Sequence, residues 1–242
     1  MSREGRWGST RRHTATNDDW GSMGDVITLE ALRRRRHEQR APVRTRTRAT
    51  LYFDLASPAT YLAAERVNKL FVDLDWRPVL RDALYGGDPL ADVAVRERDE
   101  QTATKRAALL RLPLIWPERA PTARAAMRVA SLACERGRGG AFVLAASRLA
   151  FCGGFELEDP EVLAEAIAAA GLPLDAAFEA AGDKRRDQAM VDDALRLLAA
   201  GADVVPVIRV NRLLFCGEDR LIEAAAAAQA PPAPARRVPR AG

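Results

Sequence analysis

The sequence predicts an α/β domain, and three observations indicate that fold class. A short β-type run, "ATLYFDL" (residues 49–55), passes at Ser57-Pro58 into apolar residues at helical spacing. Alanine-rich helical segments fill the middle of the chain, and a tight hairpin followed by a helix closes it. The predicted order is therefore strand, helix, strand, a helical insertion, a further helix, two strands and a last helix.

The first three elements form one predicted unit. In "ATYLAAERVNKLF" (residues 59–71) the apolar residues recur at helical spacing, and Pro58 at the first helical position is preorganised for a helix start. The run "LDWRPVL" (residues 74–80) predicts a second strand. We expect it to lie parallel to the first strand, in a right-handed strand–helix–strand unit.

Each predicted helix of the middle region ends at a glycine, the usual C-terminal stop. The helical segments are residues 120–137, 139–153, 159–171, 173–182 and 184–201, each ending at a glycine. After them "VIRV" and "LLFC" predict a hairpin about Asn211-Arg212, with a final helix behind it.

Both ends of the chain differ in composition from the middle. Residues 1–48 carry twelve arginines against six acidic residues and lack sustained apolar periodicity, which predicts a disordered Arg-rich leader. The Pro- and Arg-rich tail, residues 231–242, is also predicted to be disordered. One domain is expected over residues 49–230, with the helical insertion at about 100–200.

Composition excludes several classes of function. Without the leader the charge is nearly balanced, which argues against a nucleic-acid groove in the core. No apolar run is long enough for a membrane span, and three widely spaced cysteines predict free thiols in a cytoplasmic protein. Both histidines lie in the leader, so the core offers neither a Ser-His-Asp triad nor a histidine-ligated metal, and no metal is expected.

Three segments together resemble a known superfamily. They are "YFDLASPATYLAAE", "FELEDPEVLAEAIAAAGL" and "GADVVPVIRVNRLLFCGEDRLIEA", and the resemblance covers about residues 50–226. They are similar to the DsbA-like superfamily, in the branch of 2-hydroxychromene-2-carboxylate isomerases and kappa-class glutathione transferases. The resemblance implies a thioredoxin-like fold with an α-helical insertion.

The turn before the first helix separates this branch from disulfide-exchanging relatives. Those relatives carry C-x-x-C, whereas this chain has Ser57-Pro58-Ala59-Thr60, so dithiol exchange has no attacking group. The resemblance implies bound glutathione as cofactor, with the Ser57 hydroxyl donating to its sulfur and the helix N-terminus favouring the thiolate. The alternative is that Ser57 only caps its helix.

Further site residues follow from the resemblance. Val205-Pro206 is expected to be cis and to offer Val205 backbone groups to glutathione; the alternative is a trans proline opening an edge strand. In "CGEDRL", Asp219 is expected to accept from the α-ammonium of glutathione, although acidic residues are also common in any first helical turn. Glu218, beside it in the same family segment, is also expected to meet the γ-glutamyl end of glutathione. It departs from the family pattern, which often has a small polar residue or Gln there, and its negative charge could repel a ligand carboxylate.

Two aromatic residues and one loop bear on the expected substrate pocket. Tyr61 follows the serine turn, and Trp116 lies in "PLIWPERAPTARA", which resembles the family's Pro-aromatic-Pro passage, so both are candidates for its wall. The alternative for each is an ordinary core position. The family's Asn-Pro-Pro-like loop is missing after the second strand, and Lys105 or Arg106 is a candidate for its basic residue.

The leading hypothesis is a glutathione-dependent isomerase of the 2-hydroxychromene-2-carboxylate type, acting on an aromatic-degradation intermediate. A kappa-like glutathione transferase would use the same site. The rival from another class is a non-catalytic thioredoxin-fold protein that lacks the CxxC motif and binds an extended peptide, and a thiol oxidoreductase ranks third. The expected partners are a small-molecule substrate and, as an option, a second copy of the chain.

Overall fold

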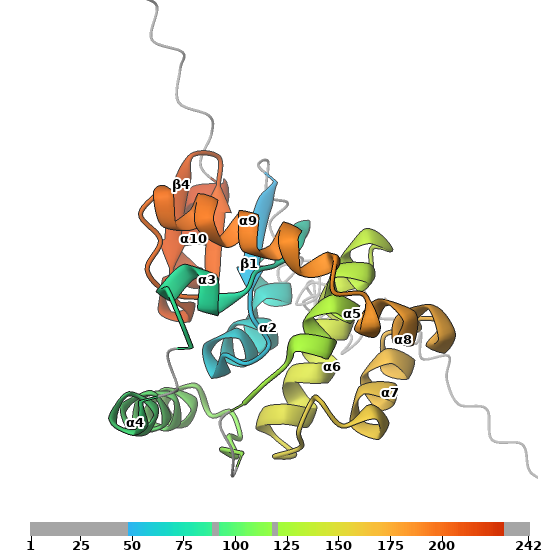
Figure 1. Cartoon of the computed structure of the whole chain (residues 1–242). Coiled ribbons are helices and arrows are strands. Elements are labelled where there is room, and N and C mark those ends of the chain that lie inside the picture. Colours follow the sequence, from blue (N-terminus) through green and yellow to red (C-terminus); the bar gives the residue numbers. More distant parts are fainter. Residues whose placement is uncertain (1–47, 89–91, 118–120, 230–242) are drawn as a thin grey trace, which may run out of the picture. The chain divides into compact units, whose positions relative to one another are not determined.

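The computed structural model describes residues 48–88, 92–117 and 121–229. The leader, apart from Arg48, and the Pro/Arg-rich tail lie outside these residues, so their predicted disorder stays a prediction. The element order within the described residues matches the predicted α/β plan (Figure 1).

A four-stranded mixed sheet forms the centre of the fold. Its strands are β1 (Ala49–Phe53), β2 (Leu74–Pro78), β3 (Val207–Val210) and β4 (Leu213–Cys216), in the order β2-β1-β3-β4. β1 is parallel to β2, as predicted, and antiparallel to β3, so Leu51 lies between Trp76 and Ile208. All five residues of β1 are buried, because helices cover both faces of this central strand.

Two pairs of helices cover the sheet. On one face α2 (Pro58–Leu70) and α10 (Leu221–Gln229) pack on apolar side chains of β1 and β3. On the other face α3 (Arg81–Tyr85) and α9 (Arg186–Ala199) pack together over Tyr52 and Val207. This burial removes apolar surface from water on both sides, which is the main driving force for the fold.

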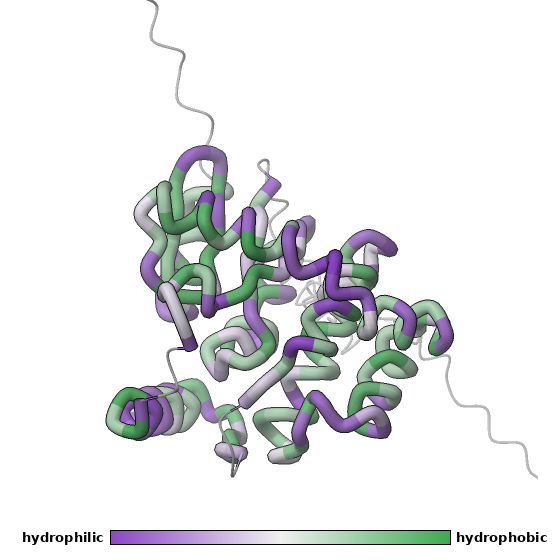
Figure 2. Tube along the Cα trace, in the orientation of Figure 1, coloured by the Kyte–Doolittle hydropathy of each residue, from purple (hydrophilic) through white to green (hydrophobic). Residues whose placement is uncertain are grey.

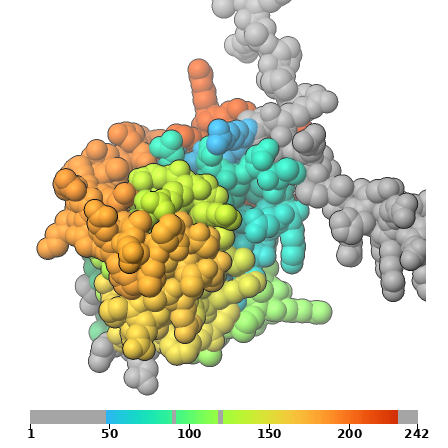
Figure 3. Space-filling model, turned by 90° about the vertical axis from the view of Figure 1, so that its right-hand side faces the viewer, coloured from blue at the N-terminus to red at the C-terminus, as the bar shows by residue number. Residues whose placement is uncertain are grey.

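Four helices of the insertion pack into one cluster beside α2. They are α5 (Arg124–Glu135), α6 (Gly139–Phe151), α7 (Pro160–Ala169) and α8 (Leu174–Gly182). In Figure 2 these helices are coloured largely pale to green, which marks neutral to hydrophobic residues and reflects their many alanines. In the view of Figure 3 the yellow and orange segments of α7 to α9 form one continuous face. None of the described helices is long and apolar enough to cross a membrane.

The long helix α4 (Val93–Leu110) was not predicted. Its sequence mixes charged and apolar residues, as Figure 2 shows, and only Ala103 and Ala107 are buried. The helix begins at Asp92, whose carboxylate accepts hydrogen bonds from the N–H groups of Ala94 and Val95. It packs against α2, where it forms one wall of the largest pocket described below.

Candidate functional site

Most of the residues predicted to meet glutathione line a pocket of about 720 Å³, and Pro206 is the one that does not. Ser57, Val205, Glu218 and Asp219, which are far apart in the sequence, all line it. The remaining lining residues are Pro58, Ala59, Leu62, Arg81, Tyr85, Val95, Arg98, Asp99, Thr102, Ala103, Arg106, Val204 and Gly217. The walls are therefore the amino end of α2, the end of α3, one face of α4, the loop before β3 and the short 3-10 helix η1 (Glu218–Arg220).

Ser57 is the N-cap residue of α2, yet its side chain makes no capping hydrogen bond. Its own N–H donates to the Asp54 carbonyl at 3.1 Å, and its carbonyl accepts from the Thr60 N–H at 3.0 Å. The first turn of α2 contains no acidic residue to offset the positive end of the helix dipole. Ser57 and the amino end of α2 therefore both border the pocket, and the positive end of a helix dipole favours an anion.

Thr60 occupies the place of the second cysteine of C-x-x-C and has a structural role. It is fully buried, and its hydroxyl oxygen accepts the Asp54 N–H at 3.4 Å. Of the two hydroxyl residues at the ends of the turn, only Ser57 lines the pocket.

Asp54 fixes the turn from behind, a role that the sequence analysis missed. Its buried carboxylate accepts the N–H groups of Ala56 and Arg81, both at 2.8 Å. Burial raises the pKa of Asp54, while Arg81 and these two N–H donors act in the opposite direction. Arg81 in turn donates to the Ala56 carbonyl at 3.1 Å, so Asp54 and Arg81 together tie the serine turn to α3.

The Val205-Pro206 peptide bond is cis, as the resemblance implied. The Val205 N–H, however, donates to the Tyr85 hydroxyl at 3.3 Å. Tyr85 was not a predicted site residue, because nothing in its local sequence distinguishes it from an ordinary helix end. The amide expected to meet glutathione thus already has a partner within the chain.

Glu218 has a different role from the one expected. Its side chain is buried and accepts from Arg66 of α2 at 2.6 Å and from the Nε of Arg106 of α4. The hydrogen bond that Arg106 donates to Glu218 raises the pKa of Arg106. The negative charge that was expected to oppose a ligand carboxylate is therefore balanced by two guanidinium groups, which join η1 to both helices.

Asp219 lies beside Glu218 with an exposed side chain. It approaches Gly217, where a Cβ atom would come within 2.6 Å of an Asp219 carboxylate oxygen. Gly217 also has a φ of +94°, so its backbone conformation favours glycine at this position.

One face of α4 supplies the polar wall opposite these segments. The lining residues of this helix are Val95, Arg98, Asp99, Thr102, Ala103 and Arg106, which recur at the three- and four-residue spacing of one helical face. Burial raises the pKa of Asp99, and the nearby Arg81 lowers it by a smaller amount. Of the two basic residues considered for this region, Arg106 lines the pocket and Lys105 does not.

The predicted substrate wall of Tyr61 and Trp116 is corrected by the structure, since neither residue lines this pocket. Tyr61 is fully buried, and its hydroxyl donates to the Pro113 carbonyl at 2.8 Å. Trp116 packs on the ring of Phe151, with centroids 6.4 Å apart. Both aromatic residues therefore belong to the packing of the helical insertion.

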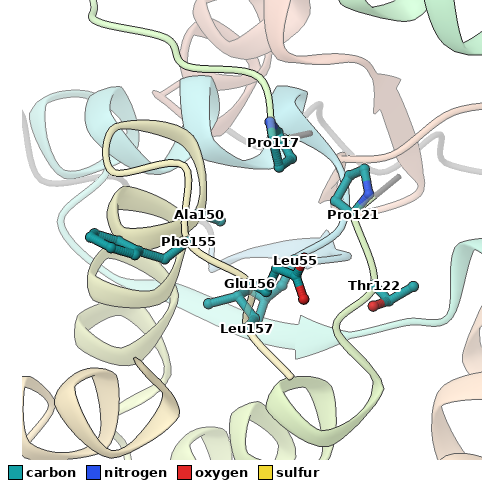
Figure 4. A pocket seen from close by; sticks show the side chains of 8 residues that line it. All are labelled: Leu55, Pro117, Pro121, Thr122, Ala150, Phe155, Glu156 and Leu157. Carbon is teal, nitrogen blue, oxygen red and sulfur yellow. The ribbon is translucent and has the colours of Figure 1, made fainter. Parts of the chain in front are cut away.

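A smaller cavity, of about 190 Å³, lies next to this passage. Figure 4 shows the side chains of Pro117, Pro121 and Thr122 on one part of its lining and those of Phe155 and Leu157 on another. Ser57 does not line it. It is therefore separate from the 720 Å³ pocket that contains the predicted site.

Thiol and metal chemistry find no support among the described residues. Cys134, Cys152 and Cys216 are free, and none of the three is among the residues that line the large pocket. Burial raises the pKa of the Cys134 thiol to about 12. No group of three or more histidine, cysteine or acidic residues suited to a metal occurs in the described part of the chain.

Comparison with known proteins agrees with this architecture. A solved 2-hydroxychromene-2-carboxylate isomerase is similar with a TM-score of 0.65 at 17% sequence identity, over 74% of this chain and 93% of that one. A structure described as that of a probable DsbA oxidoreductase from Streptomyces coelicolor is similar with a TM-score of 0.59 at 21% identity, over 75% and 89% of the two chains. At these identities the likeness shows the fold. No curated protein sequence matches the chain. The family described as the DSBA-like thioredoxin domain matches residues 49–228, three quarters of the chain, and the chain belongs to that family.

Proposed function

We propose that this chain is a glutathione-dependent isomerase of the 2-hydroxychromene-2-carboxylate type, in which Ser57 stabilises the glutathione thiolate. The observation that carries the proposal is the Ser57 hydroxyl, which makes no capping bond and lines a 720 Å³ pocket at the amino end of α2. A pocket of that size is within the range of small-molecule sites.

The chemical groups around the pocket suit glutathione. Its thiolate would meet Ser57 and the amino end of α2, its α-ammonium would meet Asp219, and its carboxylates would meet guanidinium groups such as Arg98. The neutralisation of Glu218 by Arg66 and Arg106 removes the main electrostatic objection to a ligand carboxylate. The Val205 amide would join these contacts once it leaves Tyr85.

Bound glutathione would supply a thiolate that adds reversibly to an unsaturated substrate carbon and so permits rotation about a former double bond. The protein itself would contribute electrostatic stabilisation of the thiolate and positioning of the reacting groups. Ser57 donates its hydroxyl proton as a hydrogen bond to the anion, which stabilises the thiolate relative to the thiol. Asp54 and Arg81 keep the turn that carries Ser57 in place. A kappa-like transferase would use the same groups and differ in retaining the sulfur on its product.

One observation favours a second candidate, the non-catalytic binding protein. The Val205 N–H, which would align glutathione, is bonded to Tyr85. If that bond persists in the presence of glutathione, the pocket loses one of its expected ligand contacts.

Isothermal calorimetry with glutathione, combined with ultraviolet absorbance of the bound thiolate, tests the proposal. We expect saturable binding at millimolar glutathione or below, and thiolate absorbance at a pH where free glutathione is a thiol. Oxidised glutathione is the control, since it lacks the thiol and should give no thiolate signal. A folded chain that releases no heat with glutathione would favour the second candidate.

A further inference from the structure

The α4 wall of the pocket holds a carboxyl group that the proposed thiolate chemistry does not use. Asp99 lines the same pocket as Ser57, on a different wall, and its side chain is only partly exposed. Within the described ranges, its carboxylate has no hydrogen bond or ion pair with another residue. Because its carboxyl group is open to the pocket and is not tied to another side chain, Asp99 is placed to meet a bound molecule.

Burial of Asp99 favours the protonated carboxyl group, and its cationic neighbour Arg81 acts in the opposite direction. Arg81 and Tyr85 of α3 are its electrostatic neighbours, and Arg98 and Arg106 share its face of α4. Glu218 and Asp219 of η1 line the pocket as well. Arg81 is engaged with the Ala56 and Pro121 carbonyls, and Arg106 with Glu218. Burial is the larger influence, and it raises the pKa of Asp99 above that of an ordinary aspartate.

We infer that Asp99 is the proton donor to the unsaturated carbonyl substrate of the reaction proposed above. This inference rests on the proposed function. When a thiolate adds to the β-carbon, the carbon–sulfur bond forms and the carbon–carbon π bond breaks. Its electron pair moves toward the carbonyl oxygen, which takes the Asp99 proton. The Asp99 carboxylate takes that proton back when the double bond reforms and the carbon–sulfur bond breaks, so no other reactant is consumed.

Two model acceptors separate proton donation from thiolate activation. Addition of glutathione to benzylideneacetone requires a proton on the developing oxyanion, whereas substitution on chlorodinitrobenzene expels chloride and needs no proton donor. Asp99→Asn keeps the shape of the side chain and removes its acidity. We expect this variant to lower kcat/KM for benzylideneacetone relative to chlorodinitrobenzene by about 100-fold. Asp99→Glu should restore part of that ratio.

The matched control is Glu97→Gln, which removes the same charge from the same helix. Glu97 is exposed and is not a lining residue of the pocket, so its variant should keep the wild-type ratio. Equal losses on both acceptors in Asp99→Asn, or no loss on either, would overturn the inference, as would a wild-type chain that converts chlorodinitrobenzene alone. Failure of the wild-type chain to bind glutathione would instead contradict the proposed function, and it would overturn this inference as well.

The pH dependence supplies a second test. Dividing the benzylideneacetone rate by the chlorodinitrobenzene rate cancels the ionisation of the thiol. Because the proton must be on Asp99 for donation, the ratio should fall as the pH rises through the pKa of Asp99, and Asp99→Asn should abolish that fall. Carbon-13 carboxyl titration of the glutathione-free chain measures the same pKa without turnover. A pKa at or below about 4, the value of an ordinary aspartate, would contradict the inference.

Discussion

At the scale of single residues, the Ser57 hydroxyl governs the proposed chemistry. Ser57→Ala should raise the pKa of the bound glutathione thiol by about one to two pH units, because a hydrogen bond to a charged group contributes about 1.5–3 kcal/mol. The free energy of unfolding should change by less than about 0.5 kcal/mol, since the wild-type side chain makes no capping bond. Ultraviolet titration of the thiolate and urea unfolding measure the two quantities.

Thr60→Val is the matched control for Ser57→Ala. It also removes a hydroxyl group from the turn, but this hydroxyl oxygen accepts the Asp54 N–H and does not line the pocket. We expect a loss of about 1 kcal/mol in stability and no change in the thiol pKa. The opposite pattern, in which Ser57→Ala lowers stability and leaves the thiol pKa unchanged, would show that Ser57 acts only as a helix cap.

In the proposed function, Tyr85 would compete with glutathione for the Val205 amide. Tyr85→Phe leaves that N–H without its partner at 3.3 Å, so a ligand carbonyl no longer has to displace a hydrogen bond. We expect glutathione to bind about 2–10-fold more tightly by calorimetry. Tyr52→Phe, which removes a hydroxyl from a tyrosine outside the pocket, should leave the affinity unchanged. Weaker binding to Tyr85→Phe would mean that the hydroxyl itself contacts the ligand.

Sequence motifs were enough to place three residues in the candidate site. Ser57 was evident from its place before a helix, and Val205 and Asp219 from the family segments, and all three line the pocket. Asp54, Tyr85 and Asp99 were missed because their roles arise from partners or pocket walls far away in the chain. The roles expected for Tyr61 and Trp116 failed for the same reason, since packing against the insertion decided where their rings lie.

At the scale of the elements, Glu218 joins three segments that surround the pocket. Glu218→Gln would leave Arg66 and Arg106 without their carboxylate, at a site where the Glu218 side chain is 7% exposed. We expect unfolding by urea to show a loss of about 1–3 kcal/mol, below that of a fully buried ion pair, because Arg106 is partly exposed.

Glu223→Gln is the control for this prediction. It breaks the exposed ion pair with Arg220 in the same region of the chain, so its cost should stay below about 0.5 kcal/mol. Equal effects of the two substitutions would show that the Glu218 pairs add little to the joining of η1, α2 and α4.

The strength of the local pattern decided which elements the sequence could predict. β1, α2 and β2 were predicted because short β-type runs and a proline at the helix start leave clear signals in the sequence. α4 was missed because its charged residues give no strong apolar face, and it is stabilised by an Asp92 cap and by contact with α2. The face of α4 that lines the pocket carries polar residues. These residues weaken the apolar periodicity by which a helix is recognised in a sequence.

At the scale of the whole molecule, the insertion and the sheet form one folding unit. The largest core cluster contains Phe53 and Leu62 from β1 and α2 together with Met127 and Phe142 from the insertion. Removal of either part would expose this shared core to water. We therefore regard the helices α5 to α8 as part of the DSBA-like domain and not as a separate domain.

The buried side chains of all three core clusters lie between Ala49 and Ala228, which coincides with the extent of the family match. A fragment of residues 48–229 should therefore fold alone, with a Tm within about 5 °C of that of the full chain. Its glutathione affinity should agree with that of the full chain within about 2-fold, because the fragment retains every lining residue that the structure describes. Thermal melts and calorimetry on both proteins measure these quantities. A fragment that melts more than about 10 °C lower would mean that the terminal segments add burial to the core, and a folded fragment with weaker binding would place one of those segments at the pocket.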